Sequence, residues 1–299
     1  MRPLTIAISL STLLAACTAD PAAPNSSVEL NCDPYENTGQ VLEQASASLI
    51  VFGEMHGTVE SLDAVQHFIC AALEQGHAVR LGLETGHAQS AALDLALAPP
   101  FEEERIKRAA NSLWSIPDGK GSGSTLKLLK HVSAWKAEGL DVSVFTYDGE
   151  AEDYQGATNI ANVRDATMAR EIDRNLEGFD GISVVLTGNF HARKTAFEFA
   201  DQTFVPMASL ITERPVFVLT MIYGPGEAWV NASVQNEDGS IEENIGPLQL
   251  SGNAGDDAPM RTFDLEIAAD EPYDGYYYTG PITASPPAFP DLFDQPDGP

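Results

Sequence analysis

The sequence predicts an α/β fold: a mostly parallel β-sheet with helices on both faces, followed by a β-rich C-terminal appendage. Apolar segments of strand length alternate with segments in which apolar residues recur at the helical period of 3.6. The strand-like segments are apolar on both faces, which is typical of parallel strands buried between helices. A chain of 299 residues with 43% hydrophobic residues can bury a core of this kind.

The predicted elements can be placed in order along the chain. Five segments are predicted to contain strands: residues 48–53, 78–84, 140–148, 181–193, where the strand enters a turn, and 215–224. The helices expected between them cover about residues 59–75, 88–97, 101–112, 126–139 and 159–178.

The segments outside this alternation suggest the domain boundaries. After Gly224 come short alternating segments such as "EAWVNASV" and "RTFDLEI", typical of a β-rich appendage or of added edge strands. We therefore expect four parts: a signal peptide with its lipobox (1–17), a flexible tether rich in Pro, Asn and Ser (18–44), the α/β domain (45–225) and an acidic β-rich extension (226–299).

The charge of the chain is unevenly distributed. The formal net charge is -28, and residues 225–299 contribute half of it, because they contain 15 acidic residues and one base, Arg261. Such a field repels nucleic acid and anionic bilayers, and no basic stripe in the sequence offsets it. We therefore expect no nucleic-acid partner.

The first residues, "MRPLTIAISLSTLLAAC", have the features of a secretion signal, with an apolar run of about a dozen residues. The ending "LAAC" further resembles the lipobox of bacterial lipoproteins, in which Cys17 would be acylated and become the mature N-terminus. The alternative is an ordinary cleaved signal with a chance cysteine. Because Thr18 follows the cysteine in place of Asp, the expected location is the outer membrane, facing the periplasm, with the lipid as the only membrane anchor.

Two cysteines remain once Cys17 is acylated. An oxidising compartment favours a disulfide between Cys32 and Cys70, which would tie the N-terminal arm to the helix containing "QHFICAALEQ". The alternative is a buried free Cys70 and an exposed Cys32.

Four acid and imidazole groups fall at or just beyond the C-terminal ends of predicted strands. Glu54 and His56 follow "LIVFG", Glu84 closes "VRLGLE", and His191 closes "SVVLTGNFH". In an open parallel sheet these ends lie along one edge, where ligands and catalytic groups collect. The cluster could hold a divalent metal, with Glu54, His56 and His191 as ligands, or supply a general base and an orienting partner for water. Sequence spacing leaves both uses open.

Two further segments bear on this edge. His87, three residues past Glu84, is the one other histidine that could join the cleft. The segment "GKGSGST" lacks the Walker spacing and does not follow a strand, so we expect a flexible loop in which Ser124 caps the next helix.

Four segments occur in a fixed order along the chain: "GEMHGTVES", "LGLET", "RDATMAREI" and "LTGNFHAR". They resemble the motifs of the superfamily that joins ChaN-type haem-binding lipoproteins, erythromycin esterases and TIKI/TraB proteins. The resemblance covers about residues 45–225, and ChaN looks nearest, since its members are also lipoproteins with a G-N-x-H-A element.

The resemblance implies roles for the residues that match these motifs. Glu54 and His56 match the Glu-x-His element, Glu84 the second acid, His191 the late histidine, and Arg164 the arginine of the R-D-x-x-M-A helix. In the ChaN branch the implied function is haem binding in iron uptake, with no haem ligand that can be aligned here. The esterase branch implies a hydrolytic cleft in which a histidine activates water, and the TIKI branch a metal-dependent peptidase.

Three function classes remain open at this stage. A lipoprotein that binds haem or a related small molecule ranks first, an esterase-like or metal-dependent hydrolase follows closely, and a non-catalytic structural lipoprotein is third. Arg164 is expected to border the cleft as an anion contact, although an arginine in a helix, taken by itself, is more often a surface ion-pair residue.

We predict that Cys17→Ser leaves the protein unacylated and poorly attached to membranes, because the thiol that would carry the lipid is removed. Membrane fractionation and the intact mass of the protein measure this directly. If neither changes, the lipobox interpretation is wrong.

Overall fold

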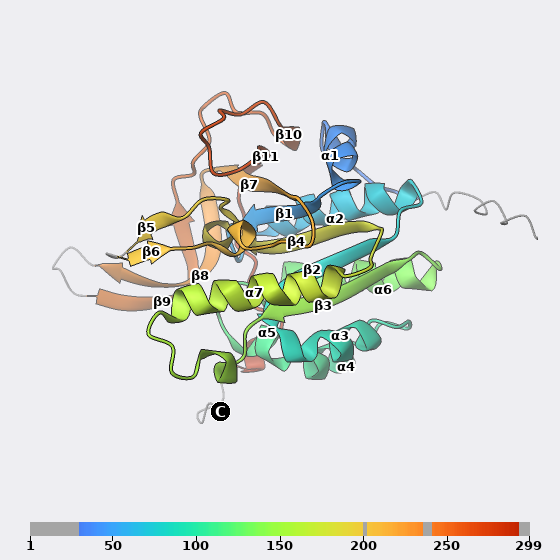
Figure 1. Ribbon diagram of the computed structural model, residues 1–299, viewed down its shortest axis with the longest axis horizontal. Coiled ribbons are helices and arrows are strands. Elements are labelled where there is room, and N and C mark those ends of the chain that lie inside the picture. The colour runs from blue at the N-terminus through green and yellow to red at the C-terminus, as the bar shows by residue number, and fades with distance from the viewer. Residues whose placement is uncertain (1–29, 200–201, 236–240, 293–299) are drawn as a thin grey trace, which may run out of the picture.

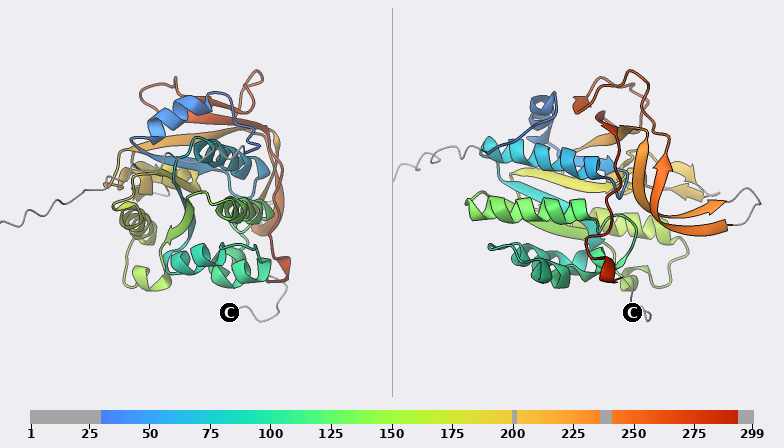
Figure 2. Two further views of the ribbon diagram at one scale, coloured as in Figure 1. Left: turned by 90° about the vertical axis from the view of Figure 1, so that its right-hand side faces the viewer. Right: turned by 180° about the vertical axis from the view of Figure 1, so that it is seen from behind.

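The computed structural model describes residues 30–199, 202–235 and 241–292, and its architecture confirms the predicted α/β class (Figure 1). The centre is a seven-stranded sheet with the order β10-β11-β7-β1-β4-β2-β3. Neighbouring strands are parallel except β10, which runs antiparallel to β11. Helices lie on both faces of the sheet (Figure 2).

The strands and helices have the following bounds. The strands are β1 (Leu49–Glu54), β2 (Val79–Gly86), β3 (Val142–Asp148), β4 (Ile182–Gly188), β5 (Phe197–Phe199), β6 (Gln202–Phe204), β7 (Val216–Gly224), β8 (Gly226–Gln235), β9 (Ile241–Leu250), β10 (Thr262–Asp264) and β11 (Gly275–Pro281). The helices are α1 (Thr38–Ala45), α2 (Val59–Glu74), α3 (Ser90–Ala96), α4 (Glu103–Ala109), α5 (Asn111–Ser115), α6 (Gly123–Ala137), α7 (Ile160–Leu176) and α8 (Asn189–Ala192). Short 3-10 helices cover His87–Gln89, Ala151–Tyr154, Met207–Ser209 and Pro290–Leu292.

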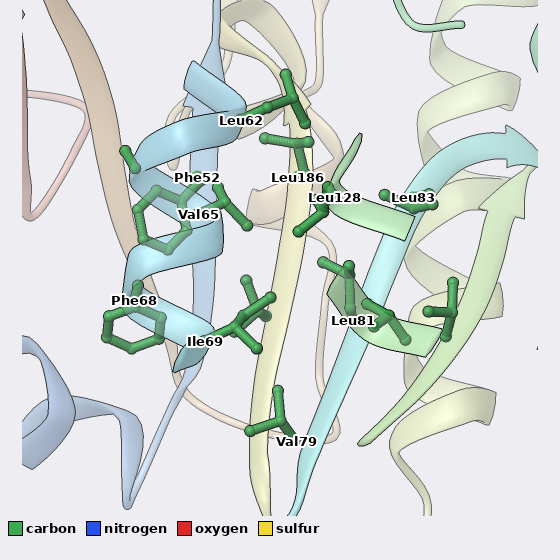
Figure 3. Packing of buried hydrophobic residues seen from close by; sticks show 14 of the residues in the cluster. Phe52, Leu62, Val65, Phe68, Ile69, Val79, Leu81, Leu83, Leu128 and Leu186 are labelled. Carbon is green, nitrogen blue, oxygen red and sulfur yellow. The ribbon is translucent and has the colours of Figure 1, made fainter. Parts of the chain in front are cut away.

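The alternating side chains of β1 divide the core into two layers. Ile50 and Phe52 belong to the core packed under α2 and α6, whereas Leu49 and Val51 belong to the core packed under α7. Figure 3 shows the first layer, in which Phe52 of the sheet meets side chains of α2. Every residue of β1 is buried, which explains why this strand appears in the sequence as a continuous apolar run.

The strand order brings the C-terminal ends of β1, β4, β2 and β3 side by side. The register pairs Glu54 with Gly188 across β1 and β4, and Gly86 with Asp148 across β2 and β3. Residues that end or follow these four strands therefore share one edge of the sheet.

The C-terminal region combines the two arrangements that its sequence suggested. Strands β10 and β11 are edge strands of the main sheet, whereas β8 and β9 form a separate two-stranded hairpin. Residues 282–288, which we call the C-terminal strap, then run back across the loops that follow β1 and precede α6. The strap donates the Ser285 amide to the Gly57 carbonyl at 2.8 Å and the Ala288 amide to the Gly121 carbonyl at 3.0 Å.

The prediction of a flexible tether over residues 18–44 is wrong for residues 30–44, the part that the structure describes. Residues 38–45 form α1, and Tyr35, Val41 and Leu42 are buried in the main core. The helix was missed because it spans only eight residues next to a segment rich in Pro and Asn. The signal peptide and Cys17 lie outside the described residues.

Two helical segments are more broken than their periodicity predicted. The segment expected as one helix over 101–112 is divided into α4 and α5, and the helix expected over 88–97 begins with a 3-10 turn. Of the described residues, none belongs to a helix that is both long enough and apolar enough to cross a membrane.

The structure joins Cys32 and Cys70, which are separated by 38 in sequence, in a disulfide. The bridge ties the segment before α1 to the buried face of α2. It therefore closes a loop that contains α1 and β1.

We predict that the double variant Cys32→Ser/Cys70→Ser loses about 3 to 4 kcal/mol of unfolding free energy, because the bridge restricts the unfolded chain over this loop. Urea unfolding followed by circular dichroism measures the loss. Alkylation of the unfolded, non-reduced wild type supplies the control: two reactive thiols at these positions would contradict the disulfide.

Candidate functional site

Charged side chains from four adjacent strand ends meet at one edge of the sheet. Glu54 ends β1, Glu84 lies near the end of β2, Asp148 ends β3, and His191 lies in α8 directly after β4. His56 Nε2 lies 3.8 Å from Glu84 Oε2, and His191 Nε2 lies 4.0 Å from Glu84 Oε1. The four strand-end residues singled out in the sequence are therefore brought into one cluster.

His56 is oriented by a buried carboxylate. Its Nδ1 donates a hydrogen bond to Glu54 Oε1 at 2.8 Å, while Glu54 Oε2 accepts one from the Ser61 hydroxyl at 2.7 Å. This arrangement leaves Nε2 facing the cluster. Burial alone would lower the pKa of His56, but its hydrogen bond to Glu54 and the charges of Glu54 and Glu84 outweigh burial, so this pKa is raised above the ordinary value for histidine.

Glu84 is the centre of the cluster and is nearly excluded from solvent, with 4% of its side chain exposed. Its Oε2 accepts hydrogen bonds from the Thr187 hydroxyl at 2.7 Å and the Gly188 amide at 2.9 Å. Its Oε1 lies 2.7 Å from Arg164 Nη2 and 3.4 Å from Lys120 Nζ. Burial would raise the pKa of Glu84, but the surrounding positive charges, Lys120 first, hold it well below its ordinary value, so the carboxylate is ionised.

Arg164 connects three members of the cluster. Its Nε and Nη2 donate to the two carboxylate oxygens of Asp148 at 2.9 and 2.6 Å, Nη2 also reaches Glu84, and Nη1 donates to His191 Nε2 at 3.0 Å. Burial would lower the pKa of this guanidinium, but Glu84 and Asp148 raise it above its ordinary value. Arg164 therefore lies inside the cluster and not on the helix surface, and most of its donors are used by the protein itself.

His191 is held in one tautomer. Its Nδ1 lies 2.9 Å from both carboxylate oxygens of Asp165, a fully buried residue that also accepts the Met207 amide at 2.6 Å. Because a guanidinium can only donate, the contact from Arg164 makes Nε2 an acceptor. In this geometry Nδ1 of His191 is paired with Asp165 and Nε2 with Arg164, whereas in the described structure no guanidinium occupies Nε2 of His56.

Three residues of the cluster were not singled out in the sequence: Lys120, Asp148 and Asp165. Asp148 carries the same signal as the others, since it ends a predicted strand. Asp165 adjoins Arg164 in the matched helix motif. Lys120 lies in the loop expected to be flexible, and that loop instead places its ammonium 3.1 Å from Asp118 and 3.4 Å from Glu84.

The N-cap of α6 also differs from the expectation. Ser122 occupies the cap position and accepts the Thr125 amide, whereas Ser124 is buried within the helix.

Two glycines are required by close approach. A Cβ on Gly188 would lie 3.1 Å from His56 Nε2 and 3.8 Å from His191 Cδ2, so a side chain there would intrude between the imidazoles. Gly57 has φ 71° and passes so close to Trp229 that a Cβ would overlap its carbonyl oxygen. At both glycines the close neighbours are other residues of the protein.

A cleft of about 170 Å³ opens beside Glu84. Its lining includes the carboxylates of Asp118, Asp148 and Glu150 together with the Lys120 ammonium. No histidine belongs to this lining: His56 and His191 approach Glu84, whereas Nε2 of His87 lies 3.1 Å from Asp153.

The side chains at this site match neither of the two cofactors that the sequence analysis allowed, a divalent metal ion and haem. Over the described ranges, no group of three or more His, Cys, Asp or Glu side chains is arranged to hold a metal ion. Glu84 instead faces the cations of Arg164 and Lys120. The cleft is also smaller than the roughly 300 to 1,000 Å³ typical of pockets for drug-sized ligands, so it does not enclose a haem.

The chain is similar in structure to several solved proteins, although no protein family and no curated sequence matches it. A succinoglycan biosynthesis protein aligns with 85% of this chain and 93% of its own, at 10% identity and a TM-score of 0.59. An erythromycin esterase in its open conformation aligns with 70% of this chain and 79% of its own, at 14% identity and a TM-score of 0.49. The haem-binding ChaN of Campylobacter jejuni aligns with 62% of this chain and 86% of its own, at 16% identity and a TM-score of 0.45. At these identities the likeness concerns the fold alone.

We predict that Arg164→Met lowers the unfolding free energy by about 2 to 3 kcal/mol, because it leaves the Glu84 and Asp148 carboxylates without their shared partner in a partly buried position. Urea unfolding measures the change. Arg170→Met is the matched control, since Arg170 on the same helix is 53% exposed and its ion pairs should contribute at most about 1 kcal/mol. Equal losses in the two variants would contradict the central role of Arg164.

Proposed function

We propose that this protein is a hydrolase of esters or amides in which His56 activates the attacking water. The observation that carries the proposal is the Glu54–His56 pair: a buried carboxylate fixes Nδ1, Nε2 faces the charged cluster, and 23% of the His56 side chain is exposed to water. An imidazole oriented by a carboxylate is the usual arrangement for a general base. No serine or cysteine is needed as nucleophile if water attacks directly.

The reaction balances within this set of groups. His56 Nε2 accepts a proton from water as the water oxygen attacks the substrate carbonyl, and the imidazolium then returns that proton to the leaving oxygen or nitrogen. The negative charge that develops on the carbonyl oxygen is stabilised by the Lys120 ammonium, whose pKa burial lowers but Glu84 and Asp118 raise, so that it stays charged. Arg164 holds Glu84 and Asp148 in place around this centre, and His191 accepts its third contact.

Haem binding in iron uptake, which ranked first in the sequence analysis, is less well supported by this site. The cleft is small and its lining is acidic, with one ammonium. The proposed location, in the bacterial envelope through a lipid on Cys17, agrees with the Cys32–Cys70 disulfide, because such bridges persist in oxidising compartments.

We predict that His56→Ala and Glu84→Gln each lower kcat/KM for an ester found by screening nitrophenyl and naphthyl substrates by about 100-fold or more. The double variant should lose little beyond the worse single one, because groups that act as a unit are strongly non-additive. His87→Ala is the matched control, since this histidine pairs with Asp153 and contacts neither Glu84 nor His56 in the described structure. Additive losses, or an equal loss in the control, would contradict the shared site.

The pH dependence gives an independent check. A general base must be neutral, and the pKa of His56 is raised, so activity should fall as the pH decreases through a midpoint above 6.5. An acid limb with its midpoint below 6.5 would exclude His56 as the base. A titration with haem, followed by its absorption spectrum, separates the two functions: saturable binding that survives in His56→Ala, with no ester hydrolysis, would favour the haem-binding alternative.

A further inference from the structure

An aromatic surface, which we call the aromatic shelf, continues outward from His191. It consists of Phe190, Phe197 and Phe204. The ring of Phe204 lies 5.9 Å from that of His191 and 5.3 Å from that of Phe197, which in turn lies 5.8 Å from Phe190. These distances are typical of interacting aromatic pairs, so the rings form a connected surface that begins at the catalytic cluster.

The position of the shelf is set by several contacts. Phe197 and Phe204 face each other across the β5–β6 hairpin. The side chain of Asn162, near the start of α7, donates to the Thr203 carbonyl and accepts the Val205 amide, each at 2.9 Å, so the hairpin is held to the helix that carries Arg164. Arg193 stacks on Phe197 with its guanidinium 4.7 Å from the ring centroid.

Several exposed apolar side chains lie at the same edge of the sheet as the charged cluster. In the described part of the chain, six large hydrophobic side chains are exposed. Three of them, Ile116, Ile160 and Phe190, belong to segments at the C-terminal edge of the sheet. Phe190 is 55% exposed. Apolar surface of this kind around a polar centre is typical of a ligand-binding site.

The electrostatics restrict the charge of the ligand. The cleft is lined by four carboxylates, those of Glu84, Asp118, Asp148 and Glu150, against the one ammonium of Lys120. The whole chain carries a net charge of -28. An anionic substrate would be repelled by both, and the Arg193 guanidinium stacked on Phe197 would repel a cationic group from the shelf.

We propose that the aromatic shelf binds a flat, uncharged apolar group, such as an aryl ring, of the ester or amide that His56 hydrolyses. This inference rests on the proposed function and adds the substrate class to it. The rings would orient the substrate by stacking, while its carbonyl lies between His56 and Lys120. Phe190 and Phe204 are then specificity-determining residues and not catalytic ones.

The binding test uses N-phenyl-1-naphthylamine, a neutral flat aromatic probe whose fluorescence rises in apolar surroundings, with the purified protein in detergent-free buffer. Phe190→Ser and Phe204→Ser should each weaken probe binding by about tenfold. Leu95→Ser is the matched control, because Leu95 on α3 is 76% exposed and distant in the chain from the shelf. Unchanged binding in both Phe variants, or an equal loss in the control, overturns the proposal.

The kinetic test compares kcat/KM for 2-naphthyl acetate and ethyl acetate in the same variants. The preference for the naphthyl ester should decrease in both Phe variants and stay unchanged in the control. Probe binding that follows the shelf without any ester hydrolysis would reject the proposed function but leave the shelf as a ligand site. If Phe190→Ser instead converts a dimer to a monomer in sedimentation, with probe binding unchanged, the shelf is a contact between copies and the proposal fails.

Discussion

The buried carboxylate of Glu84 is the constraint on which the site depends. A charge so far removed from water is strongly unfavourable unless donors surround it. Here the hydroxyl of Thr187, the amide of Gly188, the guanidinium of Arg164 and the ammonium of Lys120 all approach its two oxygens. Those donors come from β4, α7 and the loop before α6, so neutralising one charge brings together elements that are distant in sequence.

The need to neutralise Glu84 also gives the imidazoles of His56 and His191 different surroundings. Arg164 is drawn between Glu84, Asp148 and His191, and its donation to His191 Nε2 occupies the nitrogen that would otherwise be available for chemistry. His56 contacts no guanidinium in the described structure, and its Glu54 partner raises its proton affinity. Two carboxylate–imidazole pairs that look equivalent in composition therefore have different chemical capacities.

The sequence predicted the site residues that lie at the C-terminal ends of parallel strands. Parallel topology collects the ends of β1, β2 and β4, so Glu54, His56, Glu84 and His191 could be grouped from local patterns alone. Lys120 could not be found in this way, because its position depends on contacts from the distant C-terminal strap. The motif resemblance placed Arg164 at the border of the cleft, but it did not show which buried charges Arg164 contacts, and Asp165 was not singled out at all.

The edges of the sheet were harder to predict than its centre. Strand β11 was not singled out because its sequence, GYYYTGP, has neither a continuous apolar run nor an alternation of apolar and polar residues, although the burial of its residues alternates. Its Tyr277 is nevertheless fully buried and donates a hydrogen bond to the Gly53 carbonyl at 2.9 Å, directly before Glu54. A residue from the region expected as an appendage thus supports the first strand of the site.

The C-terminal strap has a consequence for the time at which the site can form during biosynthesis. The strap forms backbone hydrogen bonds with the loops that carry His56 and Lys120. It donates to the carbonyls of Gly57 and Gly121 and accepts from the amide of Gly123. Those loops are synthesised early, but the contacts that fix them depend on residues 282–288, near the opposite end of the chain. Pairings so distant in sequence form late, because the entropy of closing a long loop opposes them. A partly synthesised chain therefore contains His56 and Lys120 without their mutual geometry, and the complete site forms only after the strap has been synthesised and has docked.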